Sequence, residues 1–233
     1  MPAEPQLDVS FVRPEYAVLA NEFALLATEF GHGIDRAHRR DIARLASAIE
    51  HIDRFVDEVP GEAERLALWE DILRVLDGED AALPDALARA TRDLRTLGEE
   101  RDVCDRIRRI VAKEVPTSET IRNTTSKRLF VRAVLREGRL TAALALVVAG
   151  RACGGPFRKF FFRLAGPANL VDKILDVRYD YERGEVALSP SILLHARLVG
   201  ELLIRAVALV TSHPRPWRLL ALGWRYLGPR RPR

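Results

Sequence analysis

The clearest periodic pattern in the chain runs from Ile42 to Val59 and reads IARLASAIEHIDRFVDEV. Its large aliphatic residues are separated alternately by three and four positions, at Ile42, Leu45, Ile49, Ile52, Val56 and Val59. This spacing places them in one stripe along an α-helix, whereas a strand would require strict alternation of apolar and polar residues. Strand signals are almost absent elsewhere, and Ala, Leu, Arg and Glu recur at helical spacing. The sequence therefore predicts an all-α protein.

Glycine and proline residues interrupt this pattern and divide the chain into about ten predicted helices. The expected breaks lie at Gly31–Gly33, Pro60–Gly61, Gly78, Pro84, Gly98, Pro116, Gly138, Gly150, Gly154–Pro156, Pro167, Gly184, Pro190 and Pro214. Pro167 either opens a helix or kinks a longer one, and residues Ala168 to Arg183 are expected to stay helical up to Gly184. We expect a single-domain helical bundle over residues 1–213, followed by a basic amphipathic tail over residues 214–233.

The chain of 233 residues has a formal net charge of +4, which is unevenly distributed. After Glu201 there is no acidic residue, and there are seven arginines, namely Arg205, Arg215, Arg218, Arg225, Arg230, Arg231 and Arg233. The preceding residues therefore sum to −3. Because a nucleic-acid-binding domain needs a basic face on its folded part, we expect no nucleic-acid partner. The tail also carries Trp217, Trp224 and Tyr226, and fits either a peripheral contact with anionic lipid or a docked terminal helix.

The two cysteines, Cys104 and Cys153, are too few for a disulfide framework or a cysteine-based zinc site. Residues 1–10 lack the order of a secretory signal, and no apolar run is long enough to span a bilayer. These features favour a cytoplasmic protein. The motifs His-Glu-x-x-His, Gly-x-Ser-x-Gly and Gly-x-x-x-x-Gly-Lys are missing, which excludes zinc hydrolases, serine hydrolases and P-loop enzymes.

A first acidic cluster lies near the end of the apolar stripe. Asp53 and Asp57 are four positions apart and therefore lie one above the other on one helical face. Each directly follows a stripe residue, Ile52 or Val56, which places both carboxylates at the margin of the core. Glu58 adds a third acid at the end of the cluster.

A second acidic cluster lies later in the chain. Asp172, Asp176 and Asp180 form a ladder in which each like-charged step costs about 0.2–0.5 kcal/mol in an exposed helix. Lys173 and Arg183 offset only part of this repulsion, whereas a divalent cation would offset it fully. Mg²⁺ takes one or two carboxylates and completes its coordination with water and phosphate oxygens. Either cluster alone is equally compatible with a solvated helix face, but two ladders facing each other across a helical core would build a polymetal site.

The two clusters resemble the aspartate-rich motifs of squalene and phytoene synthases. The first motif is matched by Asp53-x-x-x-Asp57-Glu58, and the helix that follows contains Leu66, Leu68, Trp69 and Leu73. The second is matched by residues 169–190, which read NLVDKILDVRYDYERGEVALSP. There an Asp-x-x-x-Asp is followed by an Arg-Gly turn and a short apolar segment that ends in proline.

The ladder itself departs from that family in one place, because Asp172 stands where the family usually has asparagine. The spacing of Asp172, Asp176 and Asp180 also resembles the Asn/Ser/Glu magnesium motif of class I terpene cyclases. These resemblances imply an isoprenoid-synthase type of helical bundle in which Mg²⁺ ions clamp a prenyl diphosphate beside an apolar cavity. They imply that the catalytic aspartates are Asp53, Asp57, Asp176 and Asp180. The implied metal ligands are Asp53, Asp57, Glu58, Asp172, Asp176 and Asp180.

The diphosphate of such a substrate requires cationic partners near the cavity mouth. The candidates are Lys173, Arg225, Tyr226, Arg122 and Arg128, with Lys127 and Arg178 as further possibilities. The pair Arg225-Tyr226 resembles the C-terminal Arg-Tyr of bacterial terpene cyclases. Three phenylalanines close to the second motif are expected either to line the cavity and steady a cation or to pack in the core, namely Phe157, Phe160 and Phe161.

We therefore expect a magnesium-dependent class I terpene synthase, a lyase that ionises geranyl, farnesyl or geranylgeranyl diphosphate to a carbocation that is cyclised or rearranged. Among enzymes, the alternative is a squalene/phytoene-type prenyltransferase that joins two diphosphates head to head. Outside the enzymes, the alternative is a catalytically silent helical protein that binds an isoprenoid or a partner. A homodimer is compatible with the sequence.

Overall fold

The computed structural model describes residues 14–212 of the chain, and these residues form eight α-helices and no β-strand. The helices are α1 (Pro14–Thr28), α2 (Arg36–Asp57), α3 (Glu62–Asp77), α4 (Asp85–Glu100), α5 (Cys104–Asn123), α6 (Lys127–Ala149), α7 (Gly155–Glu182) and α8 (Ile192–Ser212). One turn of 3-10 helix, Gly150–Ala152, lies between α6 and α7. The predicted all-α class is confirmed. In the described residues, no helix is both long enough and apolar enough to cross a bilayer.

Four of the expected breaks lie inside helices, and two breaks that the sequence did not predict, at residues 101–103 and 124–126, separate α4 from α5 and α5 from α6. The described residues therefore form eight helices instead of about ten. Gly98, Pro116, Gly138 and Pro167 fall within α4, α5, α6 and α7, respectively. Pro167 therefore lies inside a longer helix and does not open a new one. By contrast, four glycines with positive φ follow the ends of helices as expected, namely Gly31, Gly78, Gly150 and Gly184.

The helices group into two compact units, which we call unit 1 and unit 2. Among the described residues, unit 1 comprises residues 14–120 and Leu140–Arg158. Unit 2 comprises Ile121–Arg139 and residues 159–212. Each unit has its own cluster of buried apolar residues.

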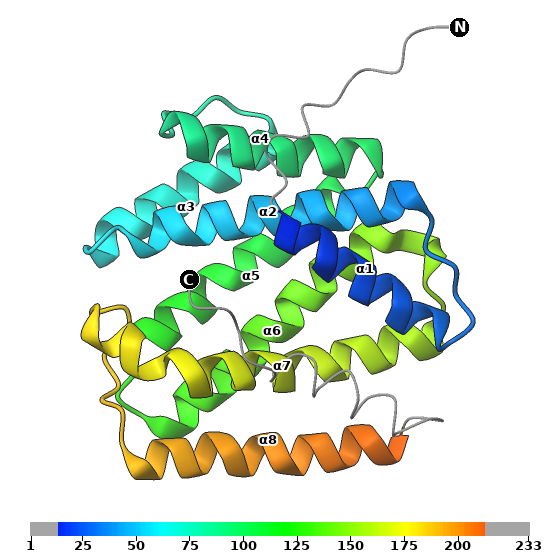
Figure 1. Ribbon diagram of the computed structural model, residues 1–233. Coiled ribbons are helices and arrows are strands. Elements are labelled where there is room, and N and C mark those ends of the chain that lie inside the picture. Colours follow the sequence, from blue (N-terminus) through cyan, green and yellow to red (C-terminus); the bar gives the residue numbers. More distant parts are fainter. Residues whose placement is uncertain (1–13, 213–233) are drawn as a thin grey trace, which may run out of the picture. The chain divides into compact units, whose positions relative to one another are not determined.

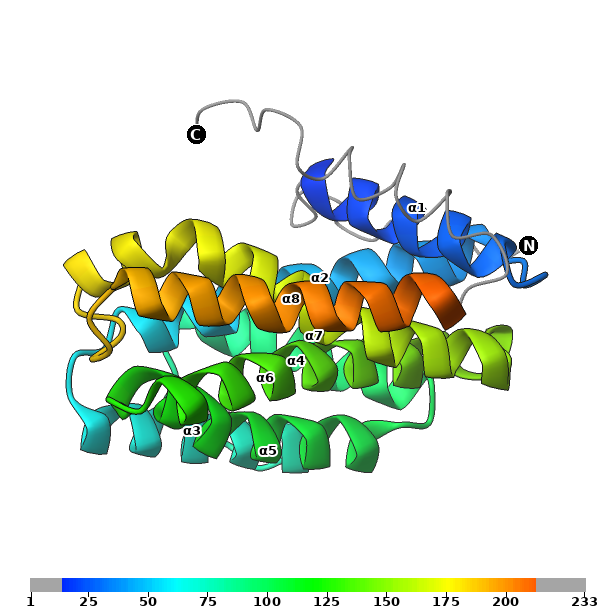
Figure 2. The ribbon, with the colours of Figure 1, turned by 90° about the horizontal axis from the view of Figure 1, so that it is seen from below.

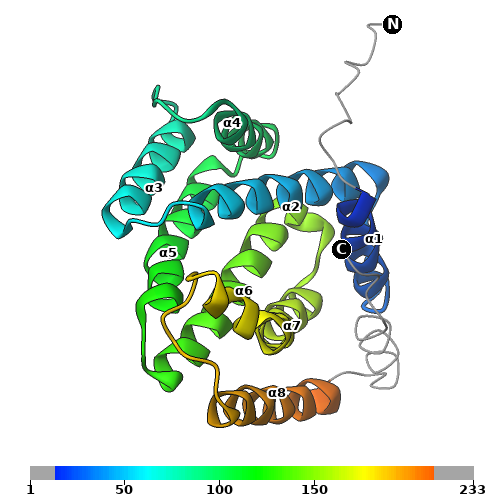
Figure 3. The ribbon, with the colours of Figure 1, turned by 60° about the vertical axis from the view of Figure 1, so that its left-hand side comes forward.

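Unit 1 is organised around α2, which packs against α1 on one side and against α4 on another, while α3 pairs with α4 (Figures 1 and 3). The apolar stripe predicted for α2 faces this core, because Ile42, Leu45, Ile52 and Val56 are buried. The packing of α1 along α2 is also visible in Figure 2.

Buried arginines join the helices of unit 1. Arg44 of α2 donates to Asp93 of α4 at 2.6 Å and to Glu100 at 2.8 Å. Burial on its own would lower the pKa of Arg44, but these two carboxylates hold it above its ordinary value. Arg101, which follows α4, forms a close ion pair with the buried Asp41 of α2. The contact between α2 and α4 is therefore ionic as well as apolar.

Unit 2 brings α6 and α7 together through glycine. A Cβ atom added to Gly138 of α6 would lie 2.5 Å from the carbonyl oxygen of Ala165 in α7, and one added to Gly166 of α7 would lie 3.1 Å from the side chain of Leu135 in α6. Any larger residue at Gly138 would collide with the backbone of α7. The glycine therefore allows the two helices to pack closely, and it does not end α6 as expected. The far side of α7 packs against α8, and the two helices lie side by side in Figures 1 and 3.

Candidate functional site

The first acidic cluster lies at the end of α2, in unit 1. The side chains of Asp53 and Asp57 are exposed, while the neighbouring Ile52 and Val56 are buried in the core. The carboxylates therefore leave the helix at the edge of its buried face, as the sequence predicts. Glu58 is the C-cap residue of α2, and its carboxylate accepts a hydrogen bond from Arg54 Nε at 3.2 Å.

The end of α2 is anchored by Arg65 of α3. Its guanidinium donates to both carboxylate oxygens of Glu119 at 2.8 Å, and to the carbonyl oxygens of Val59 and Pro60 at 3.1 and 2.9 Å. The hydrogen bonds to Glu119 raise the pKa of Arg65, burial opposes this effect, and the charge of Asp57 adds to it. The carboxylate of Asp57 thus lies within electrostatic range of a guanidinium that is held by hydrogen bonds to three residues.

The second acidic cluster lies on α7, in unit 2, and it is less exposed than the first. Asp172 and Asp176 are half-buried, and Asp180 is buried with 7% of its surface exposed. Leu170 and Val177 of the same helix are completely buried in the core of unit 2. Burial makes the repulsion between carboxylates more costly than on a solvated face. The simplest explanation of three acids at this spacing is a fully solvated helix face, and the burial of Asp180 does not agree with it.

Lys173 lies within this ladder and pairs with its last member. The Lys173 Nζ donates to Asp180 Oδ2 at 2.8 Å, and the two side chains are 21% and 10% exposed. Burial on its own would lower the pKa of Lys173, but the negative charges of Glu137, Asp180 and Asp172 hold it above its ordinary value. The ammonium group is therefore charged at neutral pH and is held among three carboxylates.

Helix α6 contributes a further carboxylate to this part of unit 2. Asn169, one turn before the ladder, donates from Nδ2 to the Val134 carbonyl oxygen at 2.8 Å and to Glu137 Oε2 at 2.7 Å. Since Gly138 lets α6 approach α7 closely, Glu137 comes within range of the Lys173 charge. We call Glu137, Asn169, Lys173 and Asp180 the α6–α7 polar network.

The other predicted partners of a diphosphate are dispersed. Arg122 is buried near the end of α5, where its carbonyl oxygen accepts a hydrogen bond from the Ala187 N–H at 2.6 Å. Arg128 is exposed in the first turn of α6. Arg225 and Tyr226 lie outside the described residues, as does the predicted tail.

The predicted cavity phenylalanines divide between the two units. Phe157 belongs to unit 1, is completely buried, and makes edge-to-face contacts with Phe23 and Phe30 at ring-centre distances of 5.3 and 5.6 Å. Phe160 is buried and Phe161 is half-buried, and both belong to unit 2. Phe157 thus takes part in the packed aromatic core of unit 1, which is the second alternative that the sequence leaves open for this residue.

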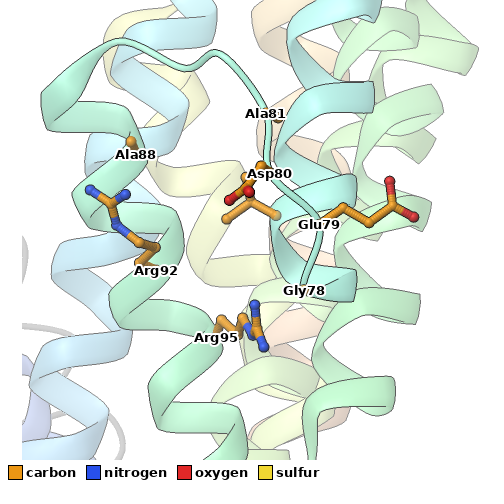
Figure 4. Close-up of a pocket in the computed structure, with 8 residues that line it drawn as sticks. Gly78, Glu79, Asp80, Ala81, Ala88, Arg92 and Arg95 are labelled. Atoms are coloured by element: carbon orange, nitrogen blue, oxygen red, sulfur yellow. The ribbon is translucent and has the colours of Figure 1, made fainter.

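A small pocket of unit 1 lies at the connection between α3 and α4 (Figure 4). Its lining consists of Val75, Gly78, Glu79, Asp80, Ala81, Ala88, Arg92 and Arg95. Acidic and basic side chains share this lining, and Arg95 donates to Glu99 at 2.8 Å. None of the residues predicted from the sequence to form a site lines this pocket.

Within the part of the chain that the structure describes, no three His, Cys, Asp or Glu side chains gather closely enough to hold a metal ion by themselves. The structure does bring together two predicted site residues, Lys173 and Asp180. It also reveals partners that the sequence reasoning missed, namely Arg65, Glu119, Glu137 and Asn169. A signal existed for Arg65, because it lies four, seven and eleven positions before Trp69, Ile72 and Leu76, and thus on the buried stripe of α3.

Comparisons of this chain with protein-family models, with curated proteins and with solved structures find no match.

Proposed function

We propose that the chain is a magnesium-dependent class I terpene synthase that ionises a linear prenyl diphosphate. The observation that carries this proposal is the reduced exposure of the α7 ladder, where Asp172 and Asp176 are half-buried and Asp180 is buried. Carboxylates four residues apart repel one another, and the repulsion grows as water is excluded. A fold that keeps three of them in this setting is well suited to an ion of opposite charge.

The donor set fits Mg²⁺. This ion prefers carboxylate oxygens, uses one or two of them, and fills its remaining positions with water and phosphate oxygens. A compact group of three protein ligands is therefore not required. In unit 2, Asp172 and Asp176 of α7 would hold such ions, and in unit 1 Asp53 and Asp57 of α2 would do so. When bound, the ions would supply the positive charge that draws off the diphosphate leaving group.

The residues around each cluster have supporting roles in this proposal. Lys173 fixes the carboxylate of Asp180 through its hydrogen bond, and a diphosphate can be bound by the same ammonium group because that group has three donor protons. Arg65 holds the end of α2 and so fixes the backbone that carries Asp57. These residues orient charge and do not react.

The direct test is incubation of the full chain with geranyl, farnesyl and geranylgeranyl diphosphate in the presence of Mg²⁺. We expect diphosphate release with at least one substrate, and a hydrocarbon or alcohol product with the carbon number of that substrate. A product with twice the carbon number would replace this proposal by the head-to-head prenyltransferase. Absence of diphosphate release with all three substrates would contradict both enzymes.

Single substitutions test whether each acidic cluster contributes to diphosphate release. Asp53→Asn and Asp176→Asn each remove one charge with little change of volume, and each should lower the rate of diphosphate release by a factor of about 100 or more. The control is Asp85→Asn, which removes an exposed aspartate from the first turn of α4 and should leave the rate unchanged. If the chain instead binds an isoprenoid silently, Asp53→Ala combined with Asp176→Ala would leave ligand binding in Mg²⁺ unchanged.

A further inference from the structure

Helix α8 exposes an apolar face. Six of its large aliphatic residues are between 40% and 88% exposed, namely Ile192, Leu193, Val199, Leu203, Ile204 and Val207. Together they present about as much surface as four fully exposed aliphatic side chains. A contiguous apolar surface of this kind marks a contact with a partner or with a membrane. We call these six residues the α8 outer face.

The opposite side of α8 already has a partner within unit 2. Leu194 and Leu198 are completely buried in the core of that unit, and Leu202 packs against it. At 100° per residue, the α8 outer face lies on the other half of the helix. The helix is thus apolar on both halves, although the core of unit 2 uses only one of them.

The charges on α8 favour an anionic partner. Glu201 pairs with Arg205 at 2.5 Å, so these two charges compensate each other. Among the exposed residues that the structure describes in α8, Arg197 is the only charged one. In the sequence, residues 202–233 contain seven arginines and no acid. An aliphatic face next to an acid-free, arginine-rich segment therefore needs a partner that offers both apolar contact and negative charge.

We propose that the α8 outer face binds the surface of an anionic phospholipid bilayer. Aliphatic side chains enter the boundary between headgroups and acyl chains, and arginines bind the phosphates, as in other helices that lie in the membrane plane. Trp217, Trp224 and Tyr226 of the following sequence are residue types that favour this boundary. A second copy of the chain is less suitable, because it would bring two arginine-rich segments together. The inference does not depend on the proposed enzyme activity.

Sedimentation with lipid vesicles tests this inference on the full chain. One set of vesicles contains equal parts of phosphatidylcholine and phosphatidylglycerol, and the other contains phosphatidylcholine alone. We expect binding to the anionic vesicles that weakens as salt is added, and much weaker binding to the neutral vesicles.

Three variants locate the binding face. Leu203→Asp should weaken binding to the anionic vesicles at least tenfold, because burial of one leucine is lost and a negative charge is added. Leu129→Asp is the matched control, since Leu129 is an exposed leucine of α6 in the same unit, and it should bind as the wild type does. Arg197→Gln should weaken binding about fivefold. Circular dichroism establishes that each variant is folded.

Three outcomes would overturn the inference. Equal vesicle binding by the wild type and Leu203→Asp would mean that α8 does not contact lipid. Absence of vesicle binding, together with a dimer in light scattering that Leu203→Asp dissociates, would assign the face to a second copy of the chain. Absence of vesicle binding by a monomer, with a lower stability of Leu203→Asp, would assign the face to residues 213–233 of the same chain.

Discussion

The two units join their helices by different means. In unit 1, buried arginines cross between helices, as Arg44 does from α2 to α4 and Arg65 does from α3 to α5. In unit 2, α6 and α7 meet through the bare backbone of Gly138, and the polar contacts between them are made by Asn169, which donates to Val134 and Glu137 of α6.

This difference determines how the two acidic clusters relate to stability. Asp53 and Asp57 of α2 are exposed, and the buried ion pairs of unit 1 are made by other residues, among them Asp41, Arg44 and Arg65. On α7, by contrast, Asp180 is both a member of the ladder and a partner in a buried ion pair. We therefore expect substitutions of Asp53 to change stability less than substitutions of Asp180, which change function and stability together.

The largest effect is expected for Arg65→Met in unit 1. This change leaves the Glu119 carboxylate without its bidentate donor and should lower the free energy of unfolding by about 3–5 kcal/mol in a urea titration. Replacing Glu119 as well, in Arg65→Met/Glu119→Leu, should recover part of the loss because no uncompensated charge remains. Arg74→Met is the control, since Arg74 is an exposed arginine of the same helix and should leave the midpoint unchanged. A double variant less stable than Arg65→Met would refute the ionic account of unit 1.

The next largest effect is expected for the reactivity of the Cys153 thiol, which belongs to unit 1. Burial raises the pKa of Cys153 to about 11, against an ordinary value of 9.0, so at pH 8 its thiolate is about a hundredfold scarcer than that of an ordinary thiol. We expect Cys153 to resist iodoacetamide in the folded protein and to react faster as the pH rises toward 11. Between the two pKa values the unfolded chain has lost this proton while the folded chain keeps it, so rising pH favours unfolding there. Rapid labelling at pH 8, read by mass spectrometry, would show that unit 1 opens locally.

A smaller loss is expected for Lys173→Met in unit 2. Asp180 would remain buried without its ammonium partner, and we expect the free energy of unfolding to fall by about 2 kcal/mol, between the values of buried and exposed pairs. The matched variant is Arg54→Met on α2, whose pair with Glu58 is exposed and should contribute less than about 1 kcal/mol. If both variants lost the same free energy of unfolding, the ion pair on α7 would contribute no more to stability than the exposed pair on α2.

The smallest effect is expected for Gly138→Ala. The new methyl group would meet the Ala165 carbonyl, and the forced separation of α6 and α7 should cost about 1–2 kcal/mol in the same urea titration. Gly155→Ala is the control, because Gly155 has no atom within 4 Å of an added Cβ and lies in the first turn of α7. If Gly138→Ala were as stable as the control, the close approach of α6 and α7 would not depend on glycine.

The sequence predicts the helices well where a single helix determines the pattern. The stripe of α2 and the end of α7 before Gly184 are both found as expected. The predicted breaks at Pro116 and Gly138 are wrong, because both residues lie inside helices. At Gly138 the local break signal was overruled by packing against a neighbouring helix, which one segment of sequence does not reveal.

In the candidate site, too, the features that depend on one helix are predicted from the sequence, and those that depend on two helices are not. The positions of Asp172, Asp176 and Asp180 on one helix follow from their spacing. Glu137, which accepts a hydrogen bond from Asn169 and lies within range of the Lys173 charge, is on another helix, and no spacing rule indicates it. Pairing across helices depends on the register in which α6 and α7 meet, and that register is set by Gly138 and Gly166.

The ion pair between Lys173 and Asp180 has a consequence for the order of assembly. Because the last step of the ladder carries its own counter-ion within the polypeptide, α7 can complete its final turns during folding without waiting for a dissolved cation. If the remaining carboxylates bind Mg²⁺ as proposed, folding of this helix and binding of the ions are separate events. The concentration of free divalent ions in the cell would govern only the second of them.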